Sequence, residues 1–231
     1  MNPFTLLTTI QNADSNTREK IAGTLDHDLM RKWLDHDNWK TRNAAVKIIG
    51  ELKLSEYSDT LIGFITDRTP ARFVDRIFGG DFHQVGFIRR NATAVLGNFA
   101  EPEKAVTDAL IAAIGDPYWE VRAQGLRTCN KLFPGPAPDD ILSSAEKALN
   151  DDVFEVAIEA VLFLAQKSGT TDVIDKFRAL YDHPNSLVKQ ALIEAFKELY
   201  DRGIIKDKSL LVKEIQDIFI PGMYGTLTGN S

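Results

Sequence analysis

The sequence predicts an all-α protein, an α-solenoid of about five to six stacked helical hairpins. One helical pattern recurs along the chain, its copies follow turns rich in Asp, Asn and Pro, and no run of alternating apolar residues indicates a strand. A single hairpin of this kind cannot bury its apolar face alone, so the copies must stack to form one continuous core.

The clearest copy of the pattern runs from Asp116 to Leu132 and carries Arg122 inside an apolar stripe. With Arg122 as the reference position, the equivalent residues in the other copies are Arg42, Arg89, Ala157 and Lys189. The copies are about 33 residues apart, except that roughly a dozen additional residues separate the first two. That spacing is typical of a repeat of two short helices.

Three offsets from the reference position share one face of each predicted helix. One residue before the reference position, the five copies have Thr41, Ile88, Val121, Val156 and Val188. Three residues after it, they have Ala45, Ala92, Gly125, Ala160 and Leu192. Seven residues after it, they have Ile49, Leu96, Cys129, Leu164 and Phe196. The middle offset is mostly small, which lets a neighbouring helix approach closely.

Other amphipathic helices are predicted between these copies, and turn residues mark their limits. The helices are expected at residues 58–65, 103–114, 140–149 and 171–181, and the turns at Asp116-Pro117, 134–136, Asn150-Asp151 and His183-Pro184. We expect one domain over residues 1–219, with a capping hairpin at 1–35 and a closing helix at 206–219. Residues 220–231, rich in glycine, are predicted to be a flexible tail.

The additional residues form a predicted insertion at 67–85. Pro70 and the pair Gly79-Gly80 favour a short helix over residues 70–78. A long connection in a compact repeat array is often functional. The candidate functional residues here are Arg68, Arg72, Arg76, Phe82 and His83. The alternative is that the aromatic side of the insertion covers a gap between repeats.

The pattern Asp-Pro-x-x-x-Val-Arg-x-x-small-x-x-x-Leu at residues 116–132 resembles the second helix of HEAT repeats, and residues 37–52 and 88–99 follow it less closely. The resemblance covers roughly residues 30–200, and its short period is closest to HEAT-like proteins of the phycobilisome-lyase type. It implies a right-handed, armadillo-type superhelix whose second helices line the concave side. It says little about function.

The resemblance also implies a structural role for the repeated arginines, each of which bonds in the family to the turn Asp of a neighbouring repeat. Carried over to this chain, these bonds would form a ladder of ion pairs along the repeats. The ladder would join Asp37, Asp116 and Asp151 to Arg42, Arg89 and Arg122.

Large aromatic residues stand three positions before the reference in three copies, at Trp39, Trp119 and Phe154. Because these residues take the same position on successive second helices, we expect them to form an aromatic column along the concave side of the solenoid. Exposed aromatic stripes mark interfaces. The candidate partner-binding residues are Trp39, Asn43, Lys47, Arg90, Tyr118, Trp119, Arg127 and Phe154. The alternative is that these rings pack over the turns of adjacent repeats.

The chain lacks the sequence signals of catalysis and of metal or cofactor binding. The histidines are not spaced as zinc ligands on a helix, Cys129 falls at a core offset, and no nucleophile elbow or phosphate-binding loop is present. We therefore expect no catalytic residue, no metal and no cofactor.

The bulk properties favour a cytoplasmic protein. The single cysteine suits a reducing compartment, and neither a secretory signal nor an apolar run long enough to span a bilayer is present. The formal net charge of −6 argues against general affinity for nucleic acid.

These observations favour a non-catalytic scaffold or adaptor that binds another protein or a peptide on the concave side. Two alternatives remain open from the resemblance: a lyase or chaperone-like subunit of the phycobilisome-lyase type, and a HEAT-like DNA glycosylase for alkylation repair. The acidic charge counts against the glycosylase.

Overall fold

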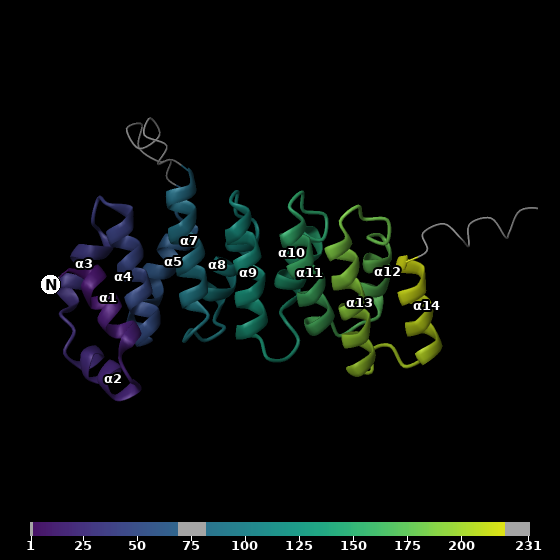
Figure 1. Cartoon of the computed structure of the whole chain (residues 1–231), viewed down its shortest axis with the longest axis horizontal. Coiled ribbons are helices and arrows are strands. Elements are labelled where there is room, and N and C mark those ends of the chain that lie inside the picture. The colour runs from purple at the N-terminus through teal and green to yellow at the C-terminus, as the bar shows by residue number, and fades with distance from the viewer. Residues whose placement is uncertain (1, 69–81, 220–231) are drawn as a thin grey trace, which may run out of the picture. The chain divides into compact units, whose positions relative to one another are not determined.

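The computed structural model describes residues 2–68 and 82–219, which form helices and turns (Figure 1). No strand occurs in these ranges, so the predicted all-helical solenoid class is confirmed. Its right-handed twist and the number of hairpins stay predictions. The predicted tail at 220–231 and the predicted helix at 70–78 lie outside the described residues. The chain forms two compact units, Met1–Leu132 and Phe133–Ser231.

Unit 1 has two layers of helices behind an N-terminal cap. Its elements are α1 (Pro3–Asn12), α2 (Ser15–Gly23), α3 (His27–Leu34), α4 (Trp39–Leu52), the short 3-10 helix η1 (Ser55–Tyr57), α5 (Ser58–Thr66), α7 (Phe82–Leu96), α8 (Lys104–Ile114) and α9 (Trp119–Leu132). Helix α7 contacts α4 on one side and α9 on the other, while α5 contacts α8 in the second layer. The three N-terminal helices all pack against α4.

The N-terminal cap contains three helices rather than the two of the expected hairpin. Asp14 accepts a hydrogen bond from the backbone N–H of Thr17 at 2.7 Å and so begins α2. Asp26 accepts from the N–H groups of Asp28 and Leu29, both at 3.0 Å, and begins α3. Each aspartate satisfies backbone donors that a helix start leaves unpaired, which divides the segment into separate helices.

Unit 2 repeats the paired arrangement. Its elements are α10 (Asp139–Ala148), α11 (Phe154–Lys167), α12 (Asp172–Arg178), α13 (Ser186–Asp201) and α14 (Lys208–Phe219). Helices α10 and α12 pack on α11, α11 packs on α13, and α14 closes the unit against α13.

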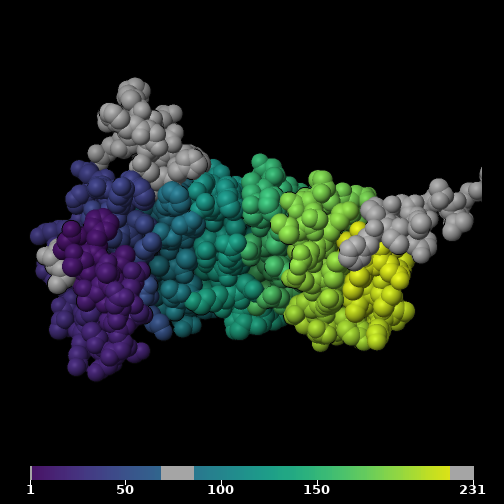
Figure 2. All heavy atoms as spheres, viewed as in Figure 1, coloured from purple at the N-terminus to yellow at the C-terminus, as the bar shows by residue number. Residues whose placement is uncertain are grey.

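The repeated apolar seam is buried throughout. Four second helices begin three residues before the reference position, at Trp39, Trp119, Phe154 and Ser186. All residues at the three apolar offsets are buried. At Gly125 an added Cβ would lie 3.0 Å from the backbone nitrogen of Ile114, so α8 approaches the backbone of α9 directly. On the face drawn in Figure 2, the atoms of neighbouring helices within each unit lie against one another.

Helix α14 is attached to unit 2 through a buried carboxylate. The residue Glu214 is 1% exposed. Its side chain accepts a hydrogen bond from Arg178 Nε at 3.2 Å and further hydrogen bonds from Arg178 Nη2 and the Tyr181 hydroxyl. Burial raises the pKa of Glu214, but these hydrogen bonds and the guanidinium charge outweigh it and hold the pKa below its usual value.

Unit 2 is therefore expected to lose stability in acid. A carboxyl group with a depressed pKa stabilises the fold above its unfolded pKa, and this stabilisation is lost as the pH falls through the folded value. Glu214→Gln should cost about 1–3 kcal/mol at neutral pH, because it replaces charge-assisted hydrogen bonds with neutral ones. It should also flatten the loss of stability below about pH 5. Urea unfolding as a function of pH measures both effects. The exposed Glu194→Gln is the control, and an unchanged acid dependence in Glu214→Gln would contradict the assignment.

Candidate functional site

Three aromatic rings form a continuous row across the second helices of unit 1. The Trp39 and Phe87 rings are stacked, with centroids 6.2 Å apart and planes 20° apart. Phe87 then meets Tyr118 edge to face, with centroids 6.0 Å apart. Trp39 and Phe87 are half-buried, whereas Tyr118 is buried. The row thus joins α4, α7 and the residue that precedes α9.

Sequence reasoning missed Phe87, the central ring of this row. The position of α7 that aligns with Trp39 is Gly86, and a Cβ added there would lie 2.4 Å from Cδ1 of Tyr118. Tyr118 thus occupies the space over the glycine, and the neighbouring Phe87 supplies the ring. A phenylalanine next to the aligned glycine was the only signal in the sequence.

Polar groups around the row are paired with one another. The Arg90 guanidinium lies 5.1 Å from the centroid of Phe87 and forms an ion pair with Glu120. Stacking of this kind is a cation–π contact. Asn91 Nδ2 donates to Asn43 Oδ1 at 2.6 Å. These pairs connect α4, α7 and α9 and fix the surroundings of the rings.

Burial raises the pKa of Tyr118, and the nearby Glu120 carboxylate raises it further. The phenol is therefore protonated and neutral at physiological pH. Its ring contributes packing against Phe87 and Gly86.

The other candidate partner-binding residues are more scattered. Lys47 is exposed on α4, and Arg127 is exposed on α9, which begins with the half-buried Trp119. Phe154 begins α11 and is half-buried in unit 2. A binding role for each of these residues stays a prediction.

A buried ion pair connects two repeats of unit 1. Arg89 on α7 donates from Nε to Asp116 Oδ2 at 2.7 Å and from Nη2 to Asp116 Oδ1 at 3.0 Å. The side chains are 5% and 0% exposed. Asp116 Oδ1 also accepts from the backbone N–H of Tyr118 at 2.8 Å. One carboxylate thus holds the turn before α9 and fastens it to α7.

Two other arginines of the expected ladder donate to backbone carbonyls. Arg42 Nη1 donates to the carbonyl oxygens of His36 and Asp37, at 2.6 and 3.1 Å. Arg122 Nη1 donates in the same way to Asp116 and Pro117, at 3.0 and 3.2 Å. Each therefore holds the turn that precedes its own helix. Ion pairing of Asp37 and Asp151 with ladder arginines stays a prediction.

Comparison with known proteins gives a family for part of the chain. Residues 107–197, from α8 to α13, match the family model described as HEAT repeats. This part of the chain belongs to the HEAT-repeat family. No curated protein matches the chain. HEAT repeats are helical scaffolds that often mediate protein interactions. The closer resemblance to the phycobilisome-lyase type stays a prediction.

At the start of the predicted insertion, Arg68 lies against the HEAT repeat that follows. Its Nη1 donates to the carbonyl of Ile65 at 2.8 Å, and its Nη2 donates to the carbonyl of Ala112 at 3.0 Å. Nη2 also lies 3.4 Å from Asp116 Oδ2. Arg68 therefore links the end of α5 to α8.

The remaining insertion candidates fall outside what the structure describes. Arg72 and Arg76 lie outside the described residues altogether. Phe82 and His83 belong to the first turn of α7, but their side chains are not among the described atoms. A functional role for the insertion stays a prediction.

Other groups that might carry chemistry are buried or dispersed. Burial raises the pKa of the Cys129 thiol to about 12, so it is protonated at neutral pH. Within residues 2–68 and 82–219, no three His, Cys, Asp or Glu side chains gather as metal ligands. In the same ranges, no helix has the length and hydropathy needed to cross a bilayer.

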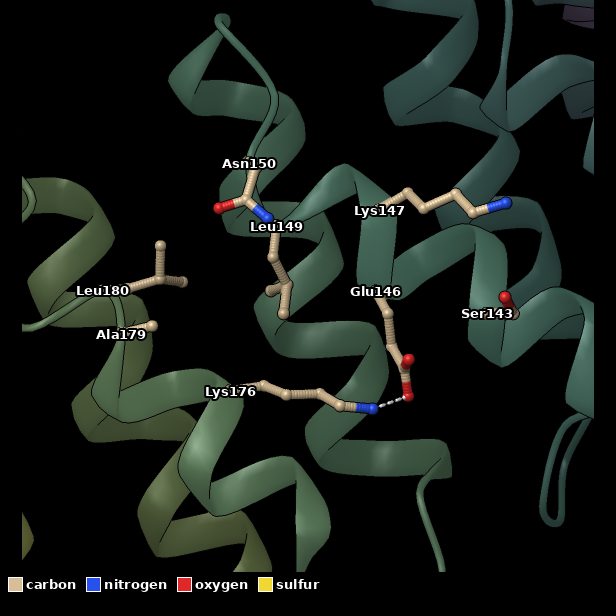
Figure 3. A pocket seen from close by; sticks show the side chains of 8 residues that line it. All are labelled: Ser143, Glu146, Lys147, Leu149, Asn150, Lys176, Ala179 and Leu180. Carbon is tan, nitrogen blue, oxygen red and sulfur yellow. Dashed lines mark ion pairs between the residues drawn. The ribbon is translucent and has the colours of Figure 1, made fainter.

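Unit 2 contains a shallow cavity of about 400 Å³ between α10 and α12 (Figure 3). Glu146 and Lys176 point toward each other across it and form an ion pair, while Leu149, Ala179 and Leu180 line its apolar part. The Glu146 and Lys176 charges are thus paired within the protein. Ser143, Lys147 and Asn150 also line the cavity.

Proposed function

We propose that this protein is a non-catalytic scaffold that binds another protein through the second helices of unit 1. We call the surface made by Trp39, Phe87, Tyr118 and Arg90 the aromatic face. The observation that carries the proposal is the row of three rings along neighbouring second helices, two of them half-buried and one buried. Aromatic and arginine side chains grouped in this way are the residue types that dominate binding energy at protein interfaces.

The packing around the rings supports binding rather than chemistry. Arg90 is held by Glu120, and Asn91 by Asn43, so the polar groups beside the rings are used to fix positions. A surface whose side chains are already ordered loses less conformational entropy when a partner docks. The HEAT match over residues 107–197 includes Tyr118 and α9 from this surface, and repeats of this family present side chains from successive helices to a partner. The family resemblance puts these helices on the side expected to be concave.

The double variant Trp39→Ala/Phe87→Ala tests this proposal. Partners would be captured from extracts of the source cells with the wild-type chain, identified, purified and titrated against both proteins. Removal of two interface aromatics should weaken binding by at least about 30-fold, because each hot-spot ring is worth roughly 1–2 kcal/mol or more.

Phe4→Ala is the matched control, because Phe4 is an exposed aromatic of the same unit, 46% accessible, on α1, a helix that contributes no residue to the aromatic face. It should bind as the wild type does. Far-UV circular dichroism must show that the double variant is folded. Equal affinity of the folded double variant and the wild type for the purified partner would refute the proposal.

A further inference from the structure

Charge is divided unevenly between the two units. Basic and acidic residues balance in residues 1–132, so the whole formal charge of −6 falls on residues 133–231. Within unit 1, the second helices carry a local excess of positive charge. Helix α7 contains no Asp or Glu, α4 contains only Glu51, and α9 contains only Glu120. The aromatic face therefore lies in a basic layer of a neutral unit.

Both acidic residues of this layer already have cationic partners. Glu51 pairs with Arg18 of α2 at 3.1 Å, and Glu120 pairs with Arg90. On α4, Lys40 and Lys47 are exposed, and no acidic side chain of the described residues pairs with either. Within the part of the chain that the structure describes, both amines therefore remain open to a partner.

Helical periodicity puts the exposed cations beside the rings. Lys40 and Lys47 are seven residues apart, two turns along one side of α4. Lys40 and Phe87 occupy the same offset, two residues before the reference arginine of their helices. On α9, Arg127 is exposed at the offset of Lys47, and Lys131 is exposed one turn further on, with its amine 2.7 Å from Asn98 Oδ1. The face is therefore apolar at its centre and basic on both flanks.

We infer that the segment bound by the aromatic face is an acidic stretch of a partner protein, with a bulky apolar side chain set among Asp and Glu residues. This inference rests on the proposed function and specifies its ligand. The apolar side chain would pack on Trp39 and Phe87, and the carboxylates would meet Lys40 and Lys47. Charge complementarity of this kind steers association and rejects partners of the wrong sign.

A nucleic acid fits the same face less well. Most arginines of the layer are already engaged: Arg89 is buried on Asp116, Arg42 and Arg122 donate to turn carbonyls, and Arg90 is paired with Glu120. Few cations are left, whereas DNA-binding proteins commonly neutralise about 6–10 phosphates. A short peptide with a few carboxylates needs only the exposed Lys40 and Lys47.

Fluorescein-labelled peptide pools of about twelve residues test the inference by fluorescence polarisation. That length suffices because three helices spaced by about 9 Å span less than an extended peptide of twelve residues. Each pool has a central Leu or Phe, flanked by Asp and Glu in the first pool, by Gln and Ser in the second, and by Lys in the third. A labelled DNA duplex of about twenty base pairs is the fourth probe.

The acidic pool should bind at least about tenfold more tightly than the neutral pool, and more tightly than the duplex. Lys40→Glu/Lys47→Glu should weaken acidic binding about tenfold, with a smaller effect at high salt. Lys20→Glu/Lys32→Glu is the matched control, since it makes the same charge change at exposed positions on α2 and α3.

Three outcomes would overturn the inference: equal binding of the acidic and neutral pools, tighter binding of the duplex, or no binding of any pool. If the purified partner still needs Trp39 and Phe87 in any of these cases, the scaffold function stands and only the acidic ligand is wrong. If the partner binds the folded Trp39→Ala/Phe87→Ala variant normally, the proposed function itself fails.

Discussion

Replacing Asp116 with alanine should lower the free energy of unfolding of unit 1 by about 3–5 kcal/mol. Asp116 is 1% exposed and accepts two hydrogen bonds from the buried Arg89 guanidinium. Without the carboxylate, Arg89 keeps its charge with no counter-charge at 5% exposure, which costs more than the lost attraction alone. The turn before α9 also loses the acceptor for the Tyr118 N–H.

Urea unfolding followed by tryptophan fluorescence measures this effect in the correct unit. All three tryptophans of the chain, Trp33, Trp39 and Trp119, belong to unit 1. Asp116→Asn separates the two contributions, because its amide oxygen still accepts a backbone hydrogen bond while the charge is lost.

Asp108→Ala is the control for the ion pair. This aspartate is 56% exposed and pairs with Lys104 on the surface of α8, so its removal should cost less than about 0.5 kcal/mol. A loss below about 1 kcal/mol in Asp116→Ala would show that the buried pair does not hold the turn in place.

Phe196→Ala should destabilise unit 2 by about 3–5 kcal/mol. The ring is fully buried at the offset seven residues after the reference position on α13. It meets Phe177 and Tyr181 edge to face, with centroids 5.9 and 6.0 Å away. Truncation removes the buried apolar area and both ring contacts, and it leaves a cavity that neighbouring helices fill only in part.

Urea unfolding followed by far-UV circular dichroism measures the loss in Phe196→Ala. Leu187→Ala on the same helix is the matched control, because Leu187 is 50% exposed and its truncation should change stability by less than about 0.5 kcal/mol. Similar unfolding curves for the two variants would mean that the ring contributes little to the core of unit 2.

The repeat could be predicted from the sequence because it depends on short-range order. Period, turn residues and cap residues are properties of neighbouring positions, so aligning five copies on Arg122 identified the second helices and their buried offsets. The same alignment predicted that the position of Gly125 needs a small residue. In the structure, a Cβ added at Gly125 would lie 3.0 Å from the backbone of α8.

The candidate site was less predictable because it depends on contacts between helices. The alignment assigned the aromatic register to one offset, but in α7 the ring comes from Phe87, since Tyr118 of the next repeat occupies the space over Gly86. The division of the N-terminal cap into three helices was missed for a local reason. Asp14 and Asp26 each act as N-caps, and the expected hairpin of two helices allowed for only one of these two helix starts.

The sequence by itself determined that this chain is a helical repeat with a buried seam, because helix periodicity and capping act over a few residues. Only the tertiary structure decided which aromatic rings contact one another and which charged side chains are paired within the protein. Arg89 and Arg90 are adjacent in the chain, yet one is buried on Asp116 and the other lies over Phe87 beside Glu120. Successive residues of a helix point in different directions, so the partner of each is set by whichever helix packs on that side.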